Sequence, residues 1–224
     1  MSSKKLDLKK KRIREFFSTF KLKPHHENKK ISEIRDEIFE EGMVYIQMKL
    51  PVNRITKKFA DSLRAKIRQN FIHADIREAT EADLESIMNL YNKAWLTVNI
   101  PFRPMAIDTL IKIFEDPDTV FLIAKVDGID AGFAILDFEG DNNELGIIEA
   151  LGVIPAFQRK GLGTIIGMAA WNYFKEKNVK ELRCEVYKDN DISIKFIKWI
   201  GFEEFGKNVY VRDDFINEEE SEYW

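Results

Sequence analysis

The segment from residue 147 to residue 187 constrains the fold most, because it passes from a strand through a loop and a helix into a second strand. Its first strand is the apolar run 147–153, which Pro155 ends. Its helix is expected over 165–177 and its second strand over 181–187. A helix that connects two strands in this way makes a crossover, and the two strands then run parallel. We therefore expect helices packed on a sheet that contains a parallel pair.

Antiparallel strands are expected ahead of this segment. Asp127-Gly128, a dipeptide that favours a two-residue hairpin turn, separates the strand-like runs 120–125 and 131–138. Gly146 would weaken a strand interior, so the next strand is placed only from Ile147 onward. The predicted fold is α/β (α+β), with a mixed, mostly antiparallel sheet flanked by helices. The remaining expected elements are strands over 74–78 and 202–211, a helix from Leu84 after the capping-box-like Thr80-Glu81-Ala82-Asp83, and helices over 106–115 and 191–200.

The N-terminal third differs from the rest of the chain in charge. Residues 1–74 hold 19 Lys and Arg against 9 Asp and Glu, whereas residues 75–224 hold 16 against 29. We expect residues 1–73 to form a basic, mainly helical extension, residues 74–214 the main domain and residues 215–224 an acidic tail. A basic segment beside an acidic body indicates either a phosphate-bearing partner or attraction between the two parts. Within the extension, the expected elements are helices around Phe16, Ile34 and Leu63 and a half-buried strand over 44–50 that Pro51 ends.

The cysteine and histidine content bears on compartment and metal binding. Cys184 is the only cysteine, so no internal disulfide bond is expected, and we predict a cytoplasmic protein. It is interpreted as a small apolar residue on the buried face of its strand. No apolar run approaches the roughly 18–20 residues that span a bilayer, so no transmembrane segment is expected. His25, His26 and His73 form no metal-ligand pattern, and we expect no metal.

The loop Gln158-Arg159-Lys160-Gly161-Leu162-Gly163-Thr164 connects the apolar strand to the amphipathic helix. The N–H groups of a first helical turn lack partners within the helix and carry about +0.5 of a charge, so this corner attracts anions. Gly161 lets the backbone approach a phosphate, and Gly163 lets the helix pack closely on the strand. Arg159 and Lys160 add positive charge. The loop therefore predicts a phosphate-binding site.

Two familiar phosphate loops do not fit this sequence. The loop has no Gly-Lys-Ser or Gly-Lys-Thr triplet, which nucleoside triphosphate loops require. Gly161 and Gly163 also lack the third glycine of the dinucleotide fingerprint, so a different phosphate carrier is implied. The alternative is an ordinary turn from strand to helix with solvated charges, which needs no ligand.

The same residues resemble a known family. Gln158-Arg159-Lys160-Gly161-Leu162-Gly163 is similar throughout to the signature of the GNAT superfamily of acetyl-CoA-dependent N-acetyltransferases, in which Gln or Arg precedes two spaced small residues. The preceding Ala150-Leu151-Gly152-Val153-Ile154-Pro155 resembles the bulged strand of that family. Glu185-Val186, followed by Asn190 and Gly201-Phe202, resembles its next strand and helix, particularly in the branch that acetylates protein N-termini. The resemblance covers about residues 74–212.

This resemblance implies acetyl-CoA as the co-substrate and assigns residues to its binding. Backbone groups near Leu151 and Val153 would hold the pantetheine arm, and Asn190 would meet the coenzyme where the two parallel strands splay apart. The coenzyme-binding residues that it implies are Leu151, Gly152, Val153, Gln158, Arg159, Lys160, Gly161, Leu162, Gly163, Thr164 and Asn190.

Transfer to an amine requires a proton acceptor, because a lysine-like amine has a pKa of about 10.4 and attacks only in its neutral form. By resemblance, Glu185 is the first candidate for this base, and Glu149, placed just before the expected bulge, is the second. Either carboxylate could instead be a solvent-facing or ion-paired strand residue. A backbone N–H near Val153 could stabilise the oxyanion of the tetrahedral intermediate.

The residue that would donate a proton to the leaving CoA thiolate differs from the one in the family pattern. The family commonly uses a tyrosine, but Ile197 stands at the corresponding position and cannot donate a proton. Three explanations are open: water protonates the thiolate, Tyr187 or Tyr210 substitutes, or the domain binds acyl-CoA without turnover. Tyr187 could equally be a half-buried aromatic residue of its strand.

Two functions remain open from the sequence. In the first, the protein is an N-acetyltransferase that transfers acetyl from acetyl-CoA to a primary amine of a small molecule, protein or peptide, by direct attack in a ternary complex. By the resemblance, Trp95, Phe102 and Arg103 would then border the acceptor site, where aromatic residues and Glu185 would suit a cationic amine. Alternatively, Trp95 and Phe102 are core or lid aromatic residues and Arg103 is a surface charge. In the second, it is a nonenzymatic acyl-CoA-binding module whose basic extension binds nucleic acid, a ribosome or an anionic surface.

Overall fold

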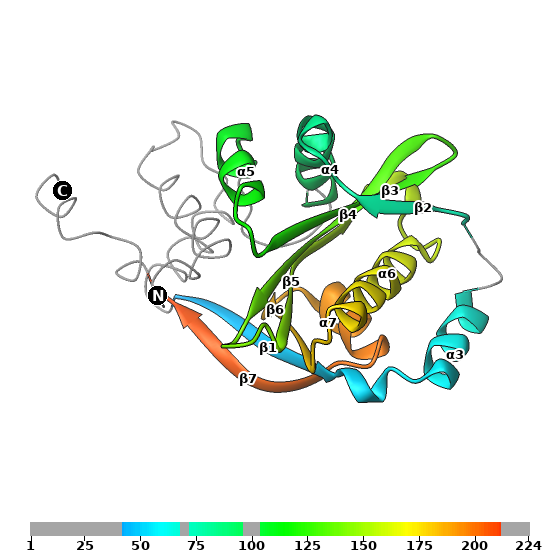
Figure 1. The fold of residues 1–224 in the computed structure, drawn as a ribbon, viewed down its shortest axis with the longest axis vertical. Helices are drawn as coiled ribbons and strands as arrows, with labels where there is room; N and C mark the ends of the chain where they lie inside the picture. Colours follow the sequence, from blue (N-terminus) through cyan, green and yellow to red (C-terminus); the bar gives the residue numbers. More distant parts are fainter. Residues whose placement is uncertain (1–41, 68–71, 96–103, 212–224) are drawn as a thin grey trace, which may run out of the picture.

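The computed structural model of the chain describes residues 42–67, 72–95 and 104–211 (Figure 1). The helices expected around Phe16 and Ile34, the residues Phe102 and Arg103, and the acidic tail lie outside these described residues. The strands are β1 (Met43–Pro51), β2 (Asp75–Glu78), β3 (Thr119–Val126), β4 (Ile129–Glu139), β5 (Leu145–Val153), β6 (Glu181–Tyr187) and β7 (Glu203–Tyr210). The α-helices are α3 (Lys57–Ile67), α4 (Leu84–Trp95), α5 (Ile107–Phe114), α6 (Leu162–Glu176) and α7 (Asp191–Trp199).

The sheet confirms the predicted mixed, mostly antiparallel architecture. Its seven described strands lie in the order β2-β3-β4-β5-β6-β1-β7. Each neighbouring pair is antiparallel except β5 and β6, which run parallel on either side of the α6 crossover. Asp127 and Gly128 form the two-residue turn between β3 and β4, and their φ angles of 50° and 80° are the positive values that a tight hairpin requires.

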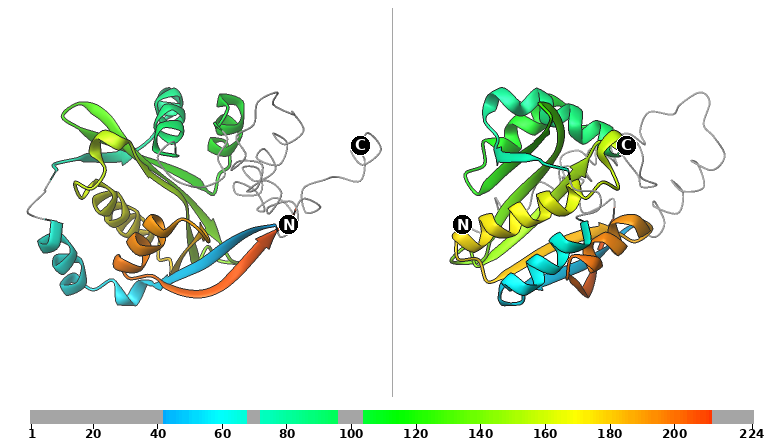
Figure 2. Two further views of the ribbon diagram at one scale, coloured as in Figure 1. Left: turned by 180° about the vertical axis from the view of Figure 1, so that it is seen from behind. Right: turned by 90° about the vertical axis from the view of Figure 1, so that its right-hand side faces the viewer.

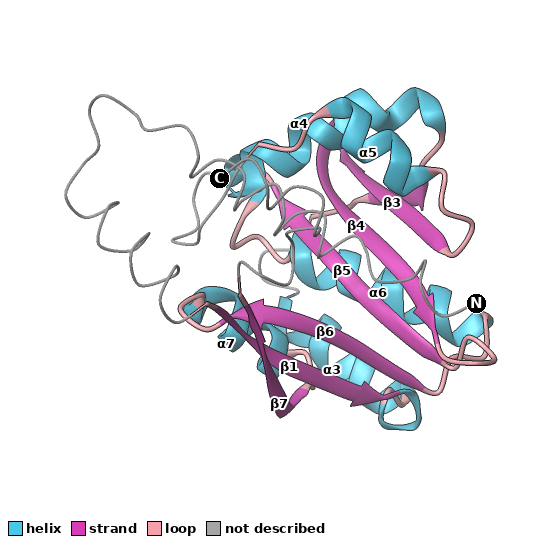
Figure 3. Cartoon of the chain, turned by 90° about the vertical axis from the view of Figure 1, so that its left-hand side faces the viewer, coloured by secondary structure: helices cyan, strands magenta, loops and turns pink. Residues whose placement is uncertain are grey.

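Helices cover the two faces of the sheet unevenly (Figures 1 and 2). On one face, α3, α6 and α7 pack on a core that includes Met48, Leu63 and Trp171. We call this the α6 side. On the opposite face, α4 and α5 pack on β3, β4 and β5 through residues such as Ile87 and Phe133 (Figure 3). Among the described residues, this α4-side core includes none from β6, β1 or β7. The side chains that these three strands direct to the α4 side are therefore not part of that core.

Strand β1 lies between β6 and β7, although it is the first strand of the described chain. It pairs antiparallel with both, and Gln47 faces Glu185 of β6 and Gly206 of β7. The helix that follows is also part of the main body, because Phe59 of α3 stacks on Trp171 of α6 with ring centroids 5.9 Å apart. The expected boundary between residues 73 and 74 therefore separates strands that lie in one sheet.

Strand β5 begins earlier than predicted. The sequence placed its start at Ile147, but the strand includes Leu145 and Gly146, and Gly146 pairs with Leu182 of β6. A Cβ atom on Gly146 would lie 2.5 Å from Cδ1 of Phe174 in α6. Close packing of the helix, which local strand propensity does not include, is therefore the reason for a glycine inside this strand.

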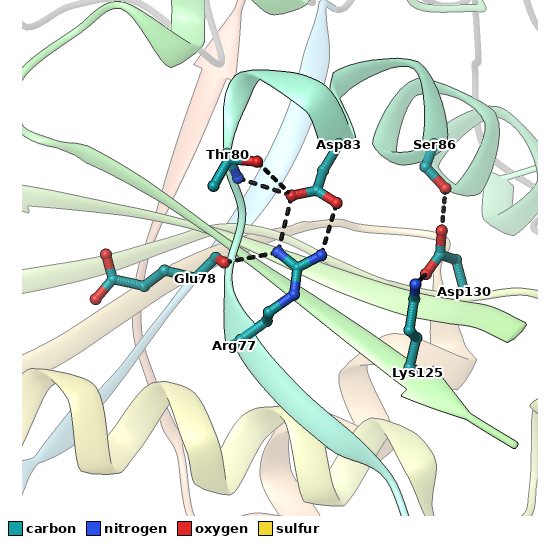
Figure 4. Close-up of polar contacts among 7 residues, drawn as sticks. All are labelled: Arg77, Glu78, Thr80, Asp83, Ser86, Lys125 and Asp130. Atoms are coloured by element: carbon teal, nitrogen blue, oxygen red, sulfur yellow. Dashed lines mark hydrogen bonds and ion pairs between the residues drawn. The ribbon is translucent and has the colours of Figure 1, made fainter. Parts of the chain in front are cut away.

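The start of α4 is fastened to β2 by a carboxylate (Figure 4). Asp83 accepts two hydrogen bonds of 2.8 Å from the Arg77 guanidinium and one of 2.8 Å from the backbone N–H of Thr80, which confirms the predicted capping box. These donors, Arg77 first, hold the pKa of Asp83 well below its usual range. In the next turn, Ser86 donates to Asp130 of β4, which ties the helix to the hairpin.

Candidate active site

Strands β5 and β6 pair over only three residues and then separate. The parallel pairs are Leu145 with Glu181, Gly146 with Leu182 and Ile147 with Arg183. Beyond them, β5 stays paired with β4 as far as Val153, and β6 stays paired with β1 as far as Tyr187. The two strands therefore diverge toward their C-terminal ends, and the loop to α6 and the start of α7 follow these ends.

A bulge in β5 places Glu149 at this opening. The register between β4 and β5 sets Ile135 opposite Ala150. The next pair is Leu136 with Ile148, which leaves Glu149 as the extra residue. The position predicted for Glu149, before the bulge, is therefore corrected to the bulge itself. Because of the bulge, Ile148 packs in the α6-side core and Ala150 in the α4-side core.

Alternation along β6 decides which of its side chains face the opening. Cys184 is buried in the α6-side core, as predicted, so Glu185 and Tyr187 project from the opposite face. Glu185 lies two residues beyond the last parallel pair on β6, and Glu149 lies two residues beyond it on β5. One carboxylate therefore stands on each of the two diverging strands.

Three side chains from two other strands hold Glu185. Gln47 Nε2 donates to Oε1 at 3.2 Å, and Asn208 Nδ2 donates to the same oxygen at 2.6 Å. The Tyr210 hydroxyl donates to Oε2 at 3.1 Å. Gln47 comes from β1, whereas Asn208 and Tyr210 come from β7. These hydrogen bonds fix the direction of the carboxylate.

Three tyrosines gather on the same face of the sheet. Tyr45 of β1 packs edge-to-face against Tyr187 of β6, with ring centroids 5.8 Å apart. It packs in the same manner against Tyr210 of β7 at 5.5 Å. Tyr187 is 7% exposed, and the other two rings are half-buried. Tyr187, a candidate proton donor from the sequence, is therefore one wall of an aromatic cluster next to Glu185.

The charge of Glu149 affects the pKa of Asp137, a residue of β4. Burial raises the pKa of Asp137 to about 7. The backbone N–H of Phe138 donates to Asp137 at 2.8 Å and acts in the opposite direction, because it lowers that pKa. The negative charges of Glu149, Asp116 and Glu139 raise that pKa further. Asp137 and Glu149 therefore share one acidic environment on the α4 side of the sheet.

A family profile decides what this arrangement belongs to. The profile of the acetyltransferase (GNAT) family matches residues 84–202, more than half of the chain. The chain belongs to the GNAT acetyltransferase family. The match runs from the start of α4 to the residue before β7, so it includes the α6 loop and both diverging strands, whereas β1 lies outside it.

Individual GNAT relatives are similar over parts of their length. A mycothiol acetyltransferase of Rhodococcus erythropolis is 31% identical over 67 residues, 30% of this chain and 22% of the relative. An uncharacterized N-acetyltransferase of Methanocaldococcus jannaschii is 29% identical over 139 residues, 58% of this chain and 60% of the relative. An aminoglycoside N(6′)-acetyltransferase type 1 of Salmonella enteritidis is 24% identical over 146 residues, 62% of this chain and 97% of the relative. The chain thus spans less than two thirds of the first two relatives.

Solved GNAT structures share the fold. The aminoglycoside N-acetyltransferase AAC(6′)-Iy in complex with CoA gives a TM-score of 0.52 at 22% identity, over 63% of this chain and 95% of that structure. The PaiA N-acetyltransferase of Thermoplasma acidophilum in complex with coenzyme A gives 0.52 at 18% identity, over 62% of this chain and 100% of that structure. At these identities the similarity establishes the GNAT fold.

In this GNAT domain, the loop after β5 leads into α6 as predicted, but the helix begins at Leu162 and not at residue 165, so Leu162, Gly163 and Thr164 belong to its first turn. Gly161 caps the helix with a φ of 84°, a left-handed conformation that glycine adopts without strain. The first N–H groups of α6 have no acceptor within the helix, and Arg159 and Lys160 are exposed beside them. The Gln158 side chain turns back, and its Nε2 donates to the carbonyl oxygen of Val153 at 2.9 Å. Gln158 therefore fixes the shape of the loop.

Other predicted coenzyme residues of the GNAT domain have their side chains engaged within the protein. Leu162 and Thr164 are buried, so a ligand at the loop would meet their backbone groups. Asn190 is 5% exposed and caps α7, with Oδ1 accepting from the backbone N–H of Ser193 at 3.2 Å. Contact of these residues with a coenzyme stays a prediction.

Two predicted coenzyme glycines differ in what their surroundings require. A Cβ atom on Gly152 would lie 2.4 Å from Cε1 of Phe133, so the α4-side core requires a glycine there. A Cβ atom on Gly163 would lie 3.6 Å from Phe196 and 3.9 Å from Leu151, which are ordinary contact distances. The predicted reason for Gly163, close packing of the helix on the strand, is therefore wrong.

The residue at the usual tyrosine position of the GNAT family lies away from the tyrosine cluster. Ile197 is half-buried in α7 and packs against the α6-side core. Tyr187 and Tyr210, the alternative proton donors, lie on the opposite face beside Glu185. Trp95 ends α4, and its buried Nε1 has no hydrogen-bond acceptor within the described residues. Its predicted place at the acceptor site stays a prediction.

Sequence reasoning did not identify Gln47, Asn208 or Asp137 as site residues. Alternation over residues 44–50 placed Tyr45 and Gln47 on one face of a strand, but it carried no information on which strands lie beside it. Gln47 donates a hydrogen bond to Glu185, from which 138 residues of sequence separate it. No motif indicates that residues of β1 and β7 lie beside Glu185. Only the strand order brings these residues together.

No metal site or membrane helix is found in the part of the chain that the structure describes. Its His, Cys, Asp and Glu residues form no group of three or more that could hold a metal ion. Its helices are all too short or too polar to cross a membrane. His25 and His26 lie outside the described residues.

Proposed function

We propose that this protein is an acetyl-CoA-dependent N-acetyltransferase that acetylates a primary amine of a cationic small molecule by direct attack in a ternary complex. The observation that carries the proposal is the divergence of β5 and β6, which brings the α6 loop, Glu149 and Glu185 to one opening. An aminoglycoside N-acetyltransferase that matches over 97% of its length supports an amine-bearing small molecule as the acceptor. The acidic character of the α4 side is consistent with a cationic acceptor.

The chemistry of the α6 loop fits acetyl-CoA as the acetyl donor. Its diphosphate would be held by backbone N–H groups at the start of α6, and Arg159 and Lys160 would add positive charge. Beyond Ile147, the edge of β5 that turns away from β6 would offer backbone groups near Leu151 and Val153 to the pantetheine arm. Asn190 would border the coenzyme from the start of α7.

We assign different roles to the two glutamates. Glu185 already accepts hydrogen bonds from three side chains, which fix its direction, so we assign it to hold positive charge of the acceptor. Glu149, the bulged residue on the facing strand, is assigned to remove the proton of the reacting amine, directly or through a water molecule. The resemblance gave the opposite order, and the hydrogen bonds to Glu185 are the reason for the change.

The later steps need little from side chains. The oxyanion of the tetrahedral intermediate would be stabilised by a backbone N–H near Val153. The CoA thiolate resembles that of cysteine, with a pKa of about 8.5, and is a tolerable leaving group. Because Ile197 cannot donate a proton, we propose that water protonates the thiolate. The absence of a dedicated acid costs a rate factor of about 10²–10⁴ and leaves the reaction possible.

Calorimetry with CoA and a thiol-release assay with acetyl-CoA test the proposal in two steps. CoA should bind, and the Arg159→Ala, Lys160→Ala double variant should bind it more weakly because two positive charges are lost. A panel of monoamines, diamines, aminoglycosides and peptides should then include acceptors that release CoA. Binding without release for every acceptor would support the nonenzymatic alternative, which Ile197 favours. A failure to bind CoA would remove both functions.

The alternative also gives a role to the basic residues. Helix α3 exposes Lys57, Lys58 and Lys66, and it packs on the α6 side of the sheet, opposite Glu185. Nucleic acid bound there by phosphate neutralisation should lose affinity steeply as the salt concentration rises. An affinity that does not change with salt would contradict this mode of binding.

A further inference from the structure

Helices α3 and α7 carry more positive than negative charge. Together they hold six Lys and Arg against two Asp, whereas residues 75–224 as a whole hold 16 Lys and Arg against 29 Asp and Glu. Both helices lie on the α6 side of the sheet (Figure 2). Four of their lysines are exposed and have no acidic partner within the described part of the chain: Lys57, Lys58, Lys66 and Lys195.

Acidic residues around this surface are paired with other basic residues. Asp61 of α3 pairs with Arg64 at 3.0 Å, and Glu204 of β7 pairs with Lys198 at 3.5 Å. Asp191, in the first turn of α7, is the only other acidic residue in the sequences of the two helices. The four lysines therefore give this surface a positive charge that neighbouring carboxylates do not neutralise.

Contacts between the two helices join these lysines into one surface. Gly201, in the turn that follows α7, has a φ of 102°, and a Cβ atom there would lie 2.8 Å from Cζ of Phe59 in α3. The glycine thus lets α3 pack closely against the end of α7. At the same end of the helices, Lys66 Nζ lies 5.9 Å from the ring centroid of Trp199. The positions of α3 and α7 relative to each other are therefore fixed by packing.

An exposed tryptophan lies among these lysines. Trp199 is 38% exposed, although Phe196 and Ile197 of the same helix pack against the α6-side core. Lys195 precedes Trp199 by one helical turn and so lies on the same face of α7. Exposed lysines neutralise phosphate groups, and bases stack on an exposed aromatic ring. Both kinds of contact are therefore offered by one surface.

The chemistry of this surface favours a single strand over two other anionic partners. In a duplex the bases are stacked on one another inside the helix, and none presents a face to Trp199. A helix that binds an anionic membrane inserts an exposed apolar face into it. The apolar face of α3 is not available for insertion, because Leu63 is buried and Phe59 stacks on Trp171 of α6.

We propose that α3 and the end of α7 form a binding surface for single-stranded nucleic acid, in which the four lysines neutralise phosphates and a base stacks on Trp199. The inference goes beyond the proposed function, because it needs no acetyl transfer. It also differs from the nonenzymatic alternative, since it adds α7 to the surface and leaves the transferase site in use. Glu185 lies on the opposite face of the sheet, so a bound strand and an acceptor amine should not compete.

The test measures binding of the full chain to a dye-labelled thymidine oligonucleotide of about 12 nucleotides, by fluorescence anisotropy over a series of salt concentrations. The affinity should fall steeply as the salt concentration rises. The double variant Lys58→Gln, Lys66→Gln should bind more weakly and make the logarithmic salt dependence shallower by about 1.4, since each phosphate contact to a single strand contributes about 0.7. Trp199→Leu should weaken binding about tenfold without changing the salt dependence, and Trp199→Phe should keep most of the affinity.

Controls separate this surface from general attraction and from the transferase site. Lys112→Gln removes an exposed lysine of α5, on the other side of the sheet, and should leave binding unchanged. Thermal unfolding shows whether each variant folds, and should Trp199→Leu fail to fold, the lysine variants make the comparison. No oligonucleotide binding, equal effects of Lys112→Gln and Lys66→Gln, or tighter binding of a duplex of equal length overturns the inference. The thiol-release assay tests the proposed function separately, and the variants of this surface should leave CoA release unchanged.

Discussion

Glu149 and Glu185 are the same residue type in opposite surroundings. Glu185 is held by the amides of Gln47 and Asn208 and by the Tyr210 hydroxyl. Glu149 occupies a bulge, where it shares an acidic environment with Asp137. We assign Glu185, whose direction is fixed by these donors, to bind the cation, and Glu149, on the neighbouring strand, to accept the proton. The two glutamates therefore need separate kinetic tests.

Replacement of each glutamate by glutamine should affect different kinetic constants. Glu149→Gln should lower kcat by about 10²-fold or more, because the reacting amine loses its base, with a smaller effect on the acceptor KM. Glu185→Gln should mainly raise the acceptor KM, by about tenfold, because a charge-assisted contact is lost. Steady-state CoA release at saturating acetyl-CoA measures both. If Glu185→Gln instead abolishes kcat with an unchanged KM, the two roles are exchanged.

Asp137 should make the protein less stable at high pH. Its folded pKa is raised to about 7, above an unfolded value of about 3.9, so its stabilising contribution is complete below pH 4 and is lost as the pH rises through 7. Asp137→Asn keeps an acceptor for the Phe138 N–H and carries no charge. At pH 8 this variant should be more stable than the parent by about 1–2 kcal/mol, allowing for solvent screening, or about 2–6 °C in Tm.

Thermal unfolding from pH 4 to pH 8 measures this difference. The Tm values of the parent and of Asp137→Asn should converge toward pH 4. Glu139→Gln, which removes a neighbouring negative charge, should give a smaller change in the same direction. A Tm difference that does not vary with pH would contradict the assignment.

At the scale of single elements, local sequence predicted most of the helices and strands, and packing decided the rest. The Asp127-Gly128 hairpin and the Thr80 capping box follow from local turn and cap chemistry, and both are confirmed. The early start of β5 at Leu145 was missed, because Gly146 is required by Phe174 of a different element. The position of the bulge at Glu149 was missed because a register shift depends on both paired strands.

The clamp between β2 and α4 should depend on pH in the direction opposite to Asp137. The pKa of Asp83 is lowered by Arg77 and by the backbone of Thr80, so its stabilisation is present above the unfolded pKa of about 3.9 and is lost as the pH falls. Asp83→Asn should therefore lower Tm at pH 7 by about 2–6 °C, as loss of a helix cap does, and the gap should narrow below pH 4.

A matched control for this clamp is present in α3. Asp61 pairs with Arg64 at 3.0 Å, and both side chains are about half exposed, so Asp61→Asn should change Tm very little. Thermal unfolding of the two variants at pH 7 makes the comparison. Equal shifts for Asp83→Asn and Asp61→Asn would show that the Arg77 contact adds nothing beyond a surface ion pair.

At the scale of the whole molecule, charge and fold divide the chain differently. The change from basic to acidic composition near residue 74 suggested a boundary between an extension and a domain. The structure nevertheless places β1 inside the sheet and buries Leu63 of α3 in the same core. The charge composition of a segment depends mainly on its exposed side chains, whereas strand order depends on pairing between distant segments. For this reason the sequence predicted β1 as a strand but did not predict which strands lie beside it.

A chain that begins at residue 74 should therefore fail to fold cooperatively. It lacks β1, with which both β6 and β7 pair, and it loses the Phe59 and Leu63 contacts of α3 with the core. Circular dichroism should show no sharp thermal transition for this chain. A chain that begins at Gly42 keeps every described element and serves as the control. A sharp transition near the parent Tm for the shorter chain would contradict this prediction.

The place of β1 in the sheet also sets the order of events during synthesis. The ribosome releases β1 long before β6 and β7, since Gln47 and Glu185 are 138 residues apart. The nascent strand must wait, with its backbone donors and acceptors unsatisfied by partners, until translation has passed Tyr210. Pairing over such separations is slow and leaves strands open to aggregation. This half of the sheet is therefore completed only after β7 has been made, and β1 waits longer for its partners than any other described strand.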